Sequence, residues 1–144
     1  MSEPTGNKEN RQAKTLMLVD DKEVSNFIMK KNITIYLPLT KTVEFTDPDL
    51  ALNKLHEVKP DLIFLDLGLP MVEDGWAFLD RLESMNTNYK VVILTSSISN
   101  EDYEKAMSYR NVVNFISKPI FGEELQAVFE ELDRQPSQNN MHTV

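Results

Sequence analysis

The sequence has no cysteine among its 144 residues. A disulfide framework, a thiolate metal site and a cysteine nucleophile are therefore excluded. Basic residues are few, since 15 Lys and Arg stand against 23 Asp and Glu, and the formal net charge is −8 with an isoelectric point near 4.7. Because phosphate contacts need clustered Lys and Arg, we expect no nucleic-acid binding.

Long apolar runs are also missing. No apolar stretch approaches the roughly 20 residues of a membrane-spanning helix, and the amino terminus, MSEPTGNKENRQAK, lacks the apolar core of a signal peptide. We therefore expect no membrane association and a cytoplasmic location. The length fits one domain, because a chain of this size buries about 68–70 % of its unfolded surface in a single core.

What the sequence does contain is a series of short apolar runs. Three of them consist of four apolar residues each, and two others mix apolar and polar residues. Runs this short, bounded by polar or turn residues, are typical of strands in a parallel sheet that is covered on both faces. The five predicted strands span residues 16–19, 42–45, 62–65, 91–94 and 112–116.

A helical pattern follows each predicted strand. Asp47 and Pro48 supply an N-cap and a proline at the first helical position, and Ser99 with Asp102 resembles a capping box. Apolar residues at helical spacing predict the faces that pack on the sheet. These are Val24, Phe27, Ile28 and Ile35; Ala51, Leu52, Leu55 and Val58; Trp76, Leu79, Leu82 and Met85; Tyr103, Ala106 and Met107; and Leu125, Val128, Phe129 and Leu132.

Strands and helices in strict alternation predict an α/β fold. Parallel strands need crossover connections, these are right-handed, and helices then cover both faces of the sheet. We predict a doubly wound five-stranded parallel sheet of order 2-1-3-4-5, the flavodoxin-like arrangement. The domain would span residues 14–133, and we expect the polar segments 1–13 and 134–144 to be disordered tails.

Polar side chains stand at the carboxyl ends of four of the five strands. Asp20 and Asp21 follow the first strand, Asp66 the third, Thr95 the fourth and Lys118 the fifth. Each alone has an ordinary explanation as a helix cap, a turn residue or a surface lysine. Because parallel strands end at one edge, where open α/β sheets bind their ligands, we expect these side chains to meet in one crevice.

Three carboxylates held close together repel one another, an arrangement that a divalent cation relieves. Mg²⁺ prefers oxygen ligands, takes one or two carboxylates and keeps positions for water and phosphate oxygens. If Asp66 attacks a phosphoryl group, a metal ion and Lys118 would hold the developing charge, and the hydroxyl of Thr95 would bond a third oxygen. The product would be an aspartyl phosphate.

From about Lys14 to Asp133 the sequence resembles the receiver domain of two-component response regulators. The matching motifs are Val19-Asp20-Asp21, Leu65-Asp66 with Pro70 and Gly75 beyond it, Leu94-Thr95-Ser96, and Lys118-Pro119. By this resemblance Asp66 would be the phosphoacceptor. Mg²⁺ or Mn²⁺ would be bound by the side chains of Asp21 and Asp66 and by the carbonyl of Gly68, while Asp20 assists through water.

The resemblance also implies a switch and partners. Thr95 would move to the phosphoryl group, Phe115 would swing inward behind it, and Lys118 would be the charge partner. The phosphodonor would be a histidine kinase or a histidine phosphotransfer protein. An unknown downstream protein would bind the fourth helix, fifth strand and fifth helix. The chain ends about eleven residues after the last predicted helix, so we expect a stand-alone receiver that phosphorylates and dephosphorylates itself without being a turnover enzyme.

The sequence departs from the family pattern in two places. The loop from Pro70 to Gly75 carries one extra residue, and Phe115 replaces the commoner tyrosine. Gly68 and Ser97 occupy the positions that tune phosphoryl hydrolysis in this family. His56 and His142 have no partner at ligand spacing, so we interpret them as surface residues.

Two alternatives stay open. The first is a receiver-like adaptor that acts without phosphorylation. The second is a small α/β enzyme or cofactor binder. An aspartate-nucleophile phosphatase would want an acid where Gly68 stands, and a flavodoxin would want a phosphate-binding loop where residues 20–23 stand.

Overall fold

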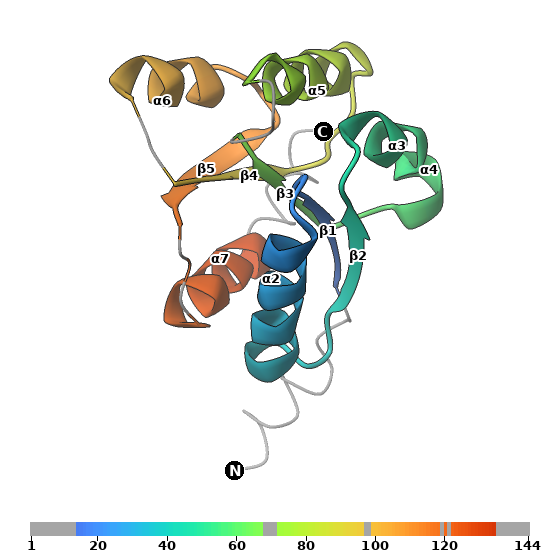
Figure 1. The fold of residues 1–144 in the computed structure, drawn as a ribbon, viewed down its shortest axis with the longest axis vertical. Helices are drawn as coiled ribbons and strands as arrows, with labels where there is room; N and C mark the ends of the chain where they lie inside the picture. Colours follow the sequence, from blue (N-terminus) through green and yellow to red (C-terminus); the bar gives the residue numbers. More distant parts are fainter. Residues whose placement is uncertain (1–13, 68–71, 97–98, 119, 121, 135–144) are drawn as a thin grey trace.

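The computed structural model describes residues 14–67, 72–96, 99–118, 120 and 122–134. Its centre is a five-stranded sheet in which every pairing is parallel and the strand order is β2-β1-β3-β4-β5 (Figure 1). The strands are β1 (Thr15–Val19), β2 (Lys41–Phe45), β3 (Leu62–Asp66), β4 (Val91–Thr95) and β5 (Val112–Ser117). The predicted fold class and strand order are confirmed.

Helices cover both faces of this sheet. Figure 1 shows α2 and α7 together on one face, and the remaining helices on the other. The helices are α2 (Glu23–Tyr36), α3 (Pro48–Asn53), α4 (Leu55–Val58), α5 (Val72–Ser84), α6 (Asn100–Met107) and α7 (Gly122–Arg134). None of the helices within these described ranges is both long and apolar enough to cross a membrane.

The side chains of the strands contribute to two separate hydrophobic cores, one on each face of the sheet. Successive side chains of a strand point to opposite faces, so Met17 and Val19 of β1 pack under α3, α4, α5 and α6, while Leu16 and Leu18 pack under α2 and α7. All five residues of β3 are buried. The central strands therefore read as nearly continuous apolar runs, as strands covered on both sides do.

The predicted helix caps form. The side chain of Asp47 accepts a hydrogen bond from the backbone N–H of Asp49, with Pro48 at the first helical position. The hydroxyl of Ser99 accepts one from the backbone N–H of Asp102 at 3.0 Å. The second predicted helix is divided at Lys54 into α3 and α4, and it ends at Lys59, which adopts a left-handed conformation with φ of 51°.

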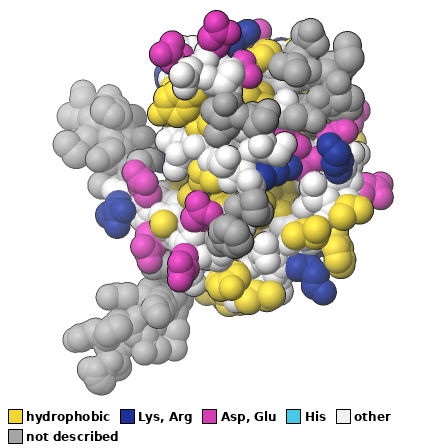
Figure 2. Space-filling view, turned by 60° about the vertical axis from the view of Figure 1, so that its left-hand side comes forward, with side chains coloured by type: hydrophobic (Ala, Val, Ile, Leu, Met, Phe, Trp, Pro, Cys, Tyr) yellow, Lys and Arg dark blue, Asp and Glu magenta, His cyan; other side chains and the backbone are white. Residues whose placement is uncertain are grey.

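The predicted core face of α2 is wrong. Val24, Phe27, Ile28 and Ile35 are 69, 58, 54 and 67 % exposed, and they are among the apolar side chains that reach the molecular surface (Figure 2 shows one side of this surface). The helix instead buries Asn26 and Ile33, with Met29 partly covered. The physical reason lies in Asn26, whose buried amide bonds two backbone carbonyls described below.

Three further inward assignments are also wrong. Met85 lies beyond the end of α5 and is 37 % exposed, and on α6 only Ala106 is buried, because Tyr103 and Met107 are 46 and 37 % exposed. Helix α6 packs against β5, an edge strand of the sheet, so the sheet covers the helix from one side only. The other predicted faces of the helices that follow β2, β3 and β5 do pack on the sheet.

Helices α5 and α6 lie side by side (Figure 1) and are joined through Trp76. The ring of Trp76 stacks with that of Tyr109 at a centroid distance of 6.3 Å, and Lys105 Nζ lies 4.4 Å from the centre of the Trp76 ring. The hydroxyl of Tyr109 donates to Asp80 on α5 at 2.6 Å. The cation–π contact therefore connects α5 to α6, and the aromatic stack and the hydrogen bond connect α5 to Tyr109, just after the end of α6.

Candidate functional site

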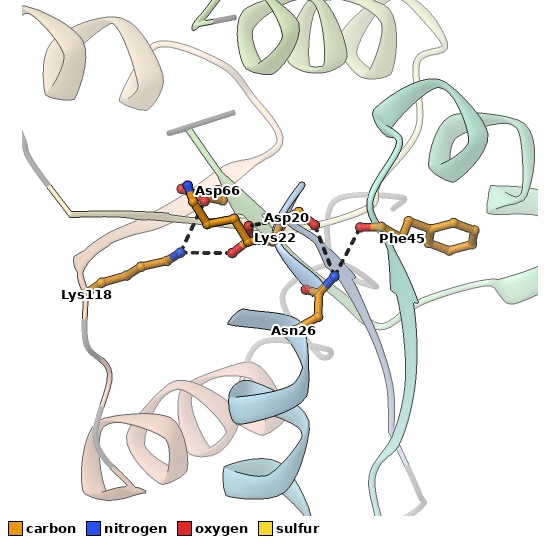
Figure 3. Close-up of polar contacts among 6 residues, drawn as sticks. All are labelled: Asp20, Lys22, Asn26, Phe45, Asp66 and Lys118. Carbon is orange, nitrogen blue, oxygen red and sulfur yellow. Dashed lines mark hydrogen bonds and ion pairs between the residues drawn. The ribbon is translucent and has the colours of Figure 1, made fainter. Parts of the chain in front are cut away.

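The carboxyl ends of four strands carry the predicted site residues. Asp20 directly follows β1, Asp66 is the last residue of β3, Thr95 is the last residue of β4, and Lys118 directly follows β5. Because all five strands run in the same direction, these residues lie at one edge of the sheet, as the sequence predicts (Figure 3 draws three of them). Asp20, Asp66 and Thr95 are buried.

Lys118 bridges the acids of two strands. Its ammonium donates to Asp20 Oδ2 at 2.9 Å and to Asp66 Oδ2 at 3.1 Å (Figure 3). Its backbone N–H donates to the carbonyl of Thr95 at 2.8 Å, which fixes the start of the side chain. Burial alone would lower the pKa of Lys118, but the two carboxylates outweigh it and hold that pKa above the ordinary lysine value.

Three carboxylates meet at this edge. Asp20, Asp21 and Asp66 each present an oxygen, and these oxygens all lie within 4.8 Å of one another. Among the described residues, the ammonium of Lys118 pairs with two of these three acids, so the cluster carries excess negative charge. Among the described residues no hydrogen-bond partner is found for Asp21 Oδ1, which is buried. An oxygen-only donor set with an orphaned buried carboxylate oxygen fits a hard divalent cation such as Mg²⁺.

Asp20 has a different environment from Asp21. Its Oδ1 accepts a hydrogen bond from the backbone N–H of Lys22 at 3.0 Å, and its Oδ2 faces Lys118. Both carboxylate oxygens of Asp20 are therefore engaged by the protein, whereas Asp21 keeps an oxygen available. Asp21 therefore offers a cation an oxygen that no described group of the protein engages.

Asn26 is a member of the site region that sequence reasoning missed. Its side-chain amide donates to the backbone carbonyls of Asp20 and Phe45 (Figure 3). The available signal was a second helical pattern on the same segment, since Asn26, Met29 and Ile33 recur at helical spacing. Because this second pattern begins with a polar residue, the more apolar pattern that includes Val24 and Phe27 was predicted to be the core face.

Phe115, the predicted switch aromatic, lies half-buried on β5. Its ring meets that of Tyr103 on α6 edge-on, with a centroid distance of 5.4 Å and an interplanar angle of 69°. It packs partly against the core under α5 and α6 and pairs with Ile93 of β4. Phe115 therefore contacts both the sheet and α6.

Several predicted positions lie outside the described residues. These are Gly68, Pro70, Ser97, Pro119, His142, and residues 1–13 and 135–144 of the two predicted tails. Arg134, with which the second predicted tail begins, is instead the last residue of α7. His56 is exposed on α4, in keeping with its interpretation as a surface residue.

Comparison with protein families finds one domain. A model described as the response regulator receiver domain matches residues 16–130. The phosphate regulon transcriptional regulatory protein PhoB of Escherichia coli (strain K12) is 32 % identical over 131 residues, covering 87 % of this chain and 54 % of that protein. The chain spans between about a third and about half of the length of the curated relatives it matches.

Solved structures give the same picture of the fold. A two component response regulator from Cytophaga hutchinsonii superposes with a TM-score of 0.75 at 25 % identity, covering 86 % of this chain and 99 % of that one. The signal receiver domain of a putative Luxo repressor protein from Vibrio parahaemolyticus gives a TM-score of 0.77 at 23 % identity, covering 90 % of this chain and 97 % of that one.

Proposed function

The chain belongs to the response regulator receiver domain family of two-component signal transduction, and we propose that it accepts a phosphoryl group on Asp66. The observation that carries this proposal is the ammonium of Lys118 held between Asp20 and Asp66, beside the carboxylate of Asp21. A lysine and an oxygen-donor cluster on either side of a buried carboxylate are what a phosphoryl acceptor needs, because the incoming group is strongly negative.

In the proposed reaction one carboxylate oxygen of Asp66 attacks the phosphorus of a phosphohistidine on a histidine kinase or phosphotransfer protein. The new P–O bond forms as the P–N bond breaks, and the electron pair of that bond returns to the imidazole nitrogen. Lys118 balances charge on the transferred group. When bound by Asp21, Asp66 and the carbonyl of Gly68, Mg²⁺ or Mn²⁺ would neutralise phosphoryl oxygen charge.

The phosphoryl group would then act as a switch. We propose that the hydroxyl of Thr95 moves to bond a phosphoryl oxygen and that Phe115 turns inward behind it. The half-buried position of Phe115 and its contact with Tyr103 support this, since a ring that touches both sheet and helix links the two. The face formed by α6, β5 and α7 would bind the downstream protein.

The proposed unit of function is residues 14–133, which enclose the matched range 16–130. We propose a cytoplasmic signalling module. Its phosphorylation and dephosphorylation occur on its own residue Asp66, and it does not turn over a separate substrate as an enzyme does. Besides the phosphodonor and the water that hydrolyses the acyl phosphate, these steps need only the divalent cation.

Intact mass measurement tests the proposal. The protein is incubated with Mg²⁺ and a small acyl phosphate, and we expect one added phosphoryl group that is absent in Asp66→Asn and present in Glu130→Gln, a control at an exposed acid of α7. If the wild-type protein never gains this mass, the adaptor function is favoured. If it hydrolyses unrelated phosphate esters over many turnovers, the enzyme is favoured.

A further inference from the structure

Asn26 is a polar residue on the buried face of α2. Its side chain is 2 % exposed, and the other covered residues of this face, Ile33 and Met29, are apolar. A buried amide is expensive unless its hydrogen-bonding groups are satisfied. Its presence on this face therefore calls for a specific partner.

The partners of Asn26 are the ends of two strands. Nδ2 donates to the carbonyl of Asp20 at 3.1 Å, just past β1, and to the carbonyl of Phe45 at 3.4 Å, the last residue of β2 (Figure 3). The carbonyl of Phe45 also accepts the backbone N–H of Asp20 at 3.0 Å. One side chain thus joins α2 to the ends of β1 and β2.

The bond to the carbonyl of Asp20 acts on Asp21. That carbonyl belongs to the peptide group between the two acids, and a peptide group is planar. With its nitrogen bonded to Phe45 and its carbonyl to Asn26, Asp20 has little freedom in its backbone. The direction in which the chain leaves β1 is then fixed, and so is the point from which the side chain of Asp21 starts.

The same contact explains the orientation of α2. Residues one or two positions apart do not share a helix face, so turning Asn26 inward turns Phe27, Ile28 and Val24 outward. The apolar exposure that results is unfavourable by itself. This cost is offset by the buried hydrogen bonds of Asn26, because an inward apolar side chain at position 26 would leave the carbonyl of Asp20 without its amide partner.

We propose that Asn26 is a positioning residue for the metal-binding acids. It does not touch the cation, and it acts by holding the peptide group that aims Asp21 at the site shared with Asp66. This inference rests on the proposed function, in which Asp21 and Asp66 hold the divalent cation. Residues that orient metal ligands typically contribute about 10- to 100-fold to metal affinity.

The test compares two residues of the same buried face. Asn26→Leu keeps the branched shape and removes the amide, and Asn26→Ser retains a shorter donor in case the leucine variant does not fold. Ile33→Ala is the matched control, because Ile33 is fully buried on α2 and no polar contact to the acids involves it. We expect Asn26→Leu to weaken Mg²⁺ binding in calorimetric titration by about tenfold or more. Ile33→Ala should lower the unfolding midpoint at least as far while changing Mg²⁺ affinity less than about twofold.

A second measurement needs no metal. Amide hydrogen exchange of metal-free protein, followed by NMR, should show the backbone N–H of Asp20 exchanging at least about tenfold faster in Asn26→Leu than in Ile33→Ala, although Ile33→Ala is destabilised at least as strongly. Unchanged exchange at Asp20, or equal losses of Mg²⁺ affinity in the two variants, overturns the positioning role. If wild-type protein binds no Mg²⁺, the proposed function fails. The exchange experiment still decides whether Asn26 holds the backbone at Asp20 and Asp21.

Discussion

The ammonium of Lys118 lies 3.1 Å from Oδ2 of Asp66, although 52 positions separate the two residues along the chain. The contact arises because β3 and β5 flank β4 and all three run in the same direction, so their carboxyl ends lie together. Lys118 also reaches Asp20, which follows β1. One cation therefore offsets part of the repulsion among acids that the topology forces together.

Replacing Lys118 by methionine should destabilise the metal-free protein. Two buried carboxylates would lose a cationic partner, and we expect the free energy of unfolding at pH 7 to fall by about 1–3 kcal/mol. Urea denaturation measures this, with Lys22→Met as the control because that side chain is exposed. Equal losses in the two variants would contradict the bridging role of Lys118.

The stability difference between wild type and Lys118→Met should also depend on pH. The pKa of Lys118 is raised in the folded state, where Asp20 and Asp66 outweigh the opposing effect of burial. A raised lysine pKa stabilises the fold fully below the unfolded value of about 10.4, and this contribution disappears as pH rises through the folded value. The stability difference between wild type and Lys118→Met should thus stay constant from about pH 7 to 9 and shrink above about pH 10.4. Urea titrations across this range check it, and a difference that already shrinks below pH 9 would refute it.

Asp21→Asn should separate metal binding from folding. The buried Oδ1 of Asp21 has no partner among the described residues, so neutralising the group removes repulsion from Asp20 and Asp66. Without metal we expect stability to be unchanged or to rise by up to about 1 kcal/mol. Bound Mg²⁺ adds about 2.7 kcal/mol at 100 times its Kd, and the variant should lose most of that gain. Thermal unfolding with and without MgCl₂ measures both effects. If MgCl₂ stabilises Asp21→Asn as much as it stabilises the wild-type protein, Asp21 is not a ligand of the cation.

Much of this fold is readable from the sequence, and the reason is visible in β3. Every residue from Leu62 to Asp66 is buried, so a continuous apolar run was required and the run itself located the strand. Once the strands were placed, parallel topology alone brought Asp20, Asp66 and Lys118 to one edge. No information about side-chain packing was needed for that step.

The orientation of α2 could not be predicted in this way. Two helical patterns overlap on the segment, one more apolar and one beginning with Asn26. The choice between them depends on the carbonyl of Phe45, which lies 19 positions away on another strand. A local pattern ranks faces by apolar content, whereas here a long-range hydrogen bond of a buried amide decides which face turns inward.

That orientation predicts opposite effects at two apolar positions of α2. Phe27→Ser should change the free energy of unfolding by no more than about 0.5 kcal/mol, because the ring is 58 % exposed and its contact with Lys31 is a surface cation–π pair. Ile33→Ala should lower it by about 2–5 kcal/mol, because Ile33 is fully buried. Chemical denaturation of the two variants and of the wild-type protein measures both. A larger loss of unfolding free energy in Phe27→Ser than in Ile33→Ala would show that the face containing Phe27, which the sequence pattern favoured, is the buried one.

The edge-on contact between Tyr103 and Phe115 predicts a measurable coupling. In a double-mutant cycle with Tyr103→Leu and Phe115→Leu, we expect an interaction energy of about 0.5 kcal/mol, at the low end for aromatic pairs because Tyr103 is 46 % exposed. Urea denaturation of the four proteins measures it. Coupling should vanish if the two rings do not meet in solution. Tyr89, which precedes β4 and whose hydroxyl donates to the carbonyl of Leu55 on α4, supplies a Tyr89→Leu control cycle with Phe115.

The stack of Trp76 against Tyr109, with the ammonium of Lys105 over the indole, gives the molecule an optical reporter. The chain has a single tryptophan, so indole fluorescence arises from one place, the junction between α5 and α6. A positive charge 4.4 Å from the ring centre makes that emission sensitive to small displacements of α6. Light emitted by the unlabelled protein can therefore follow, in real time, whether an event at Asp66 reaches the helix that carries Tyr103.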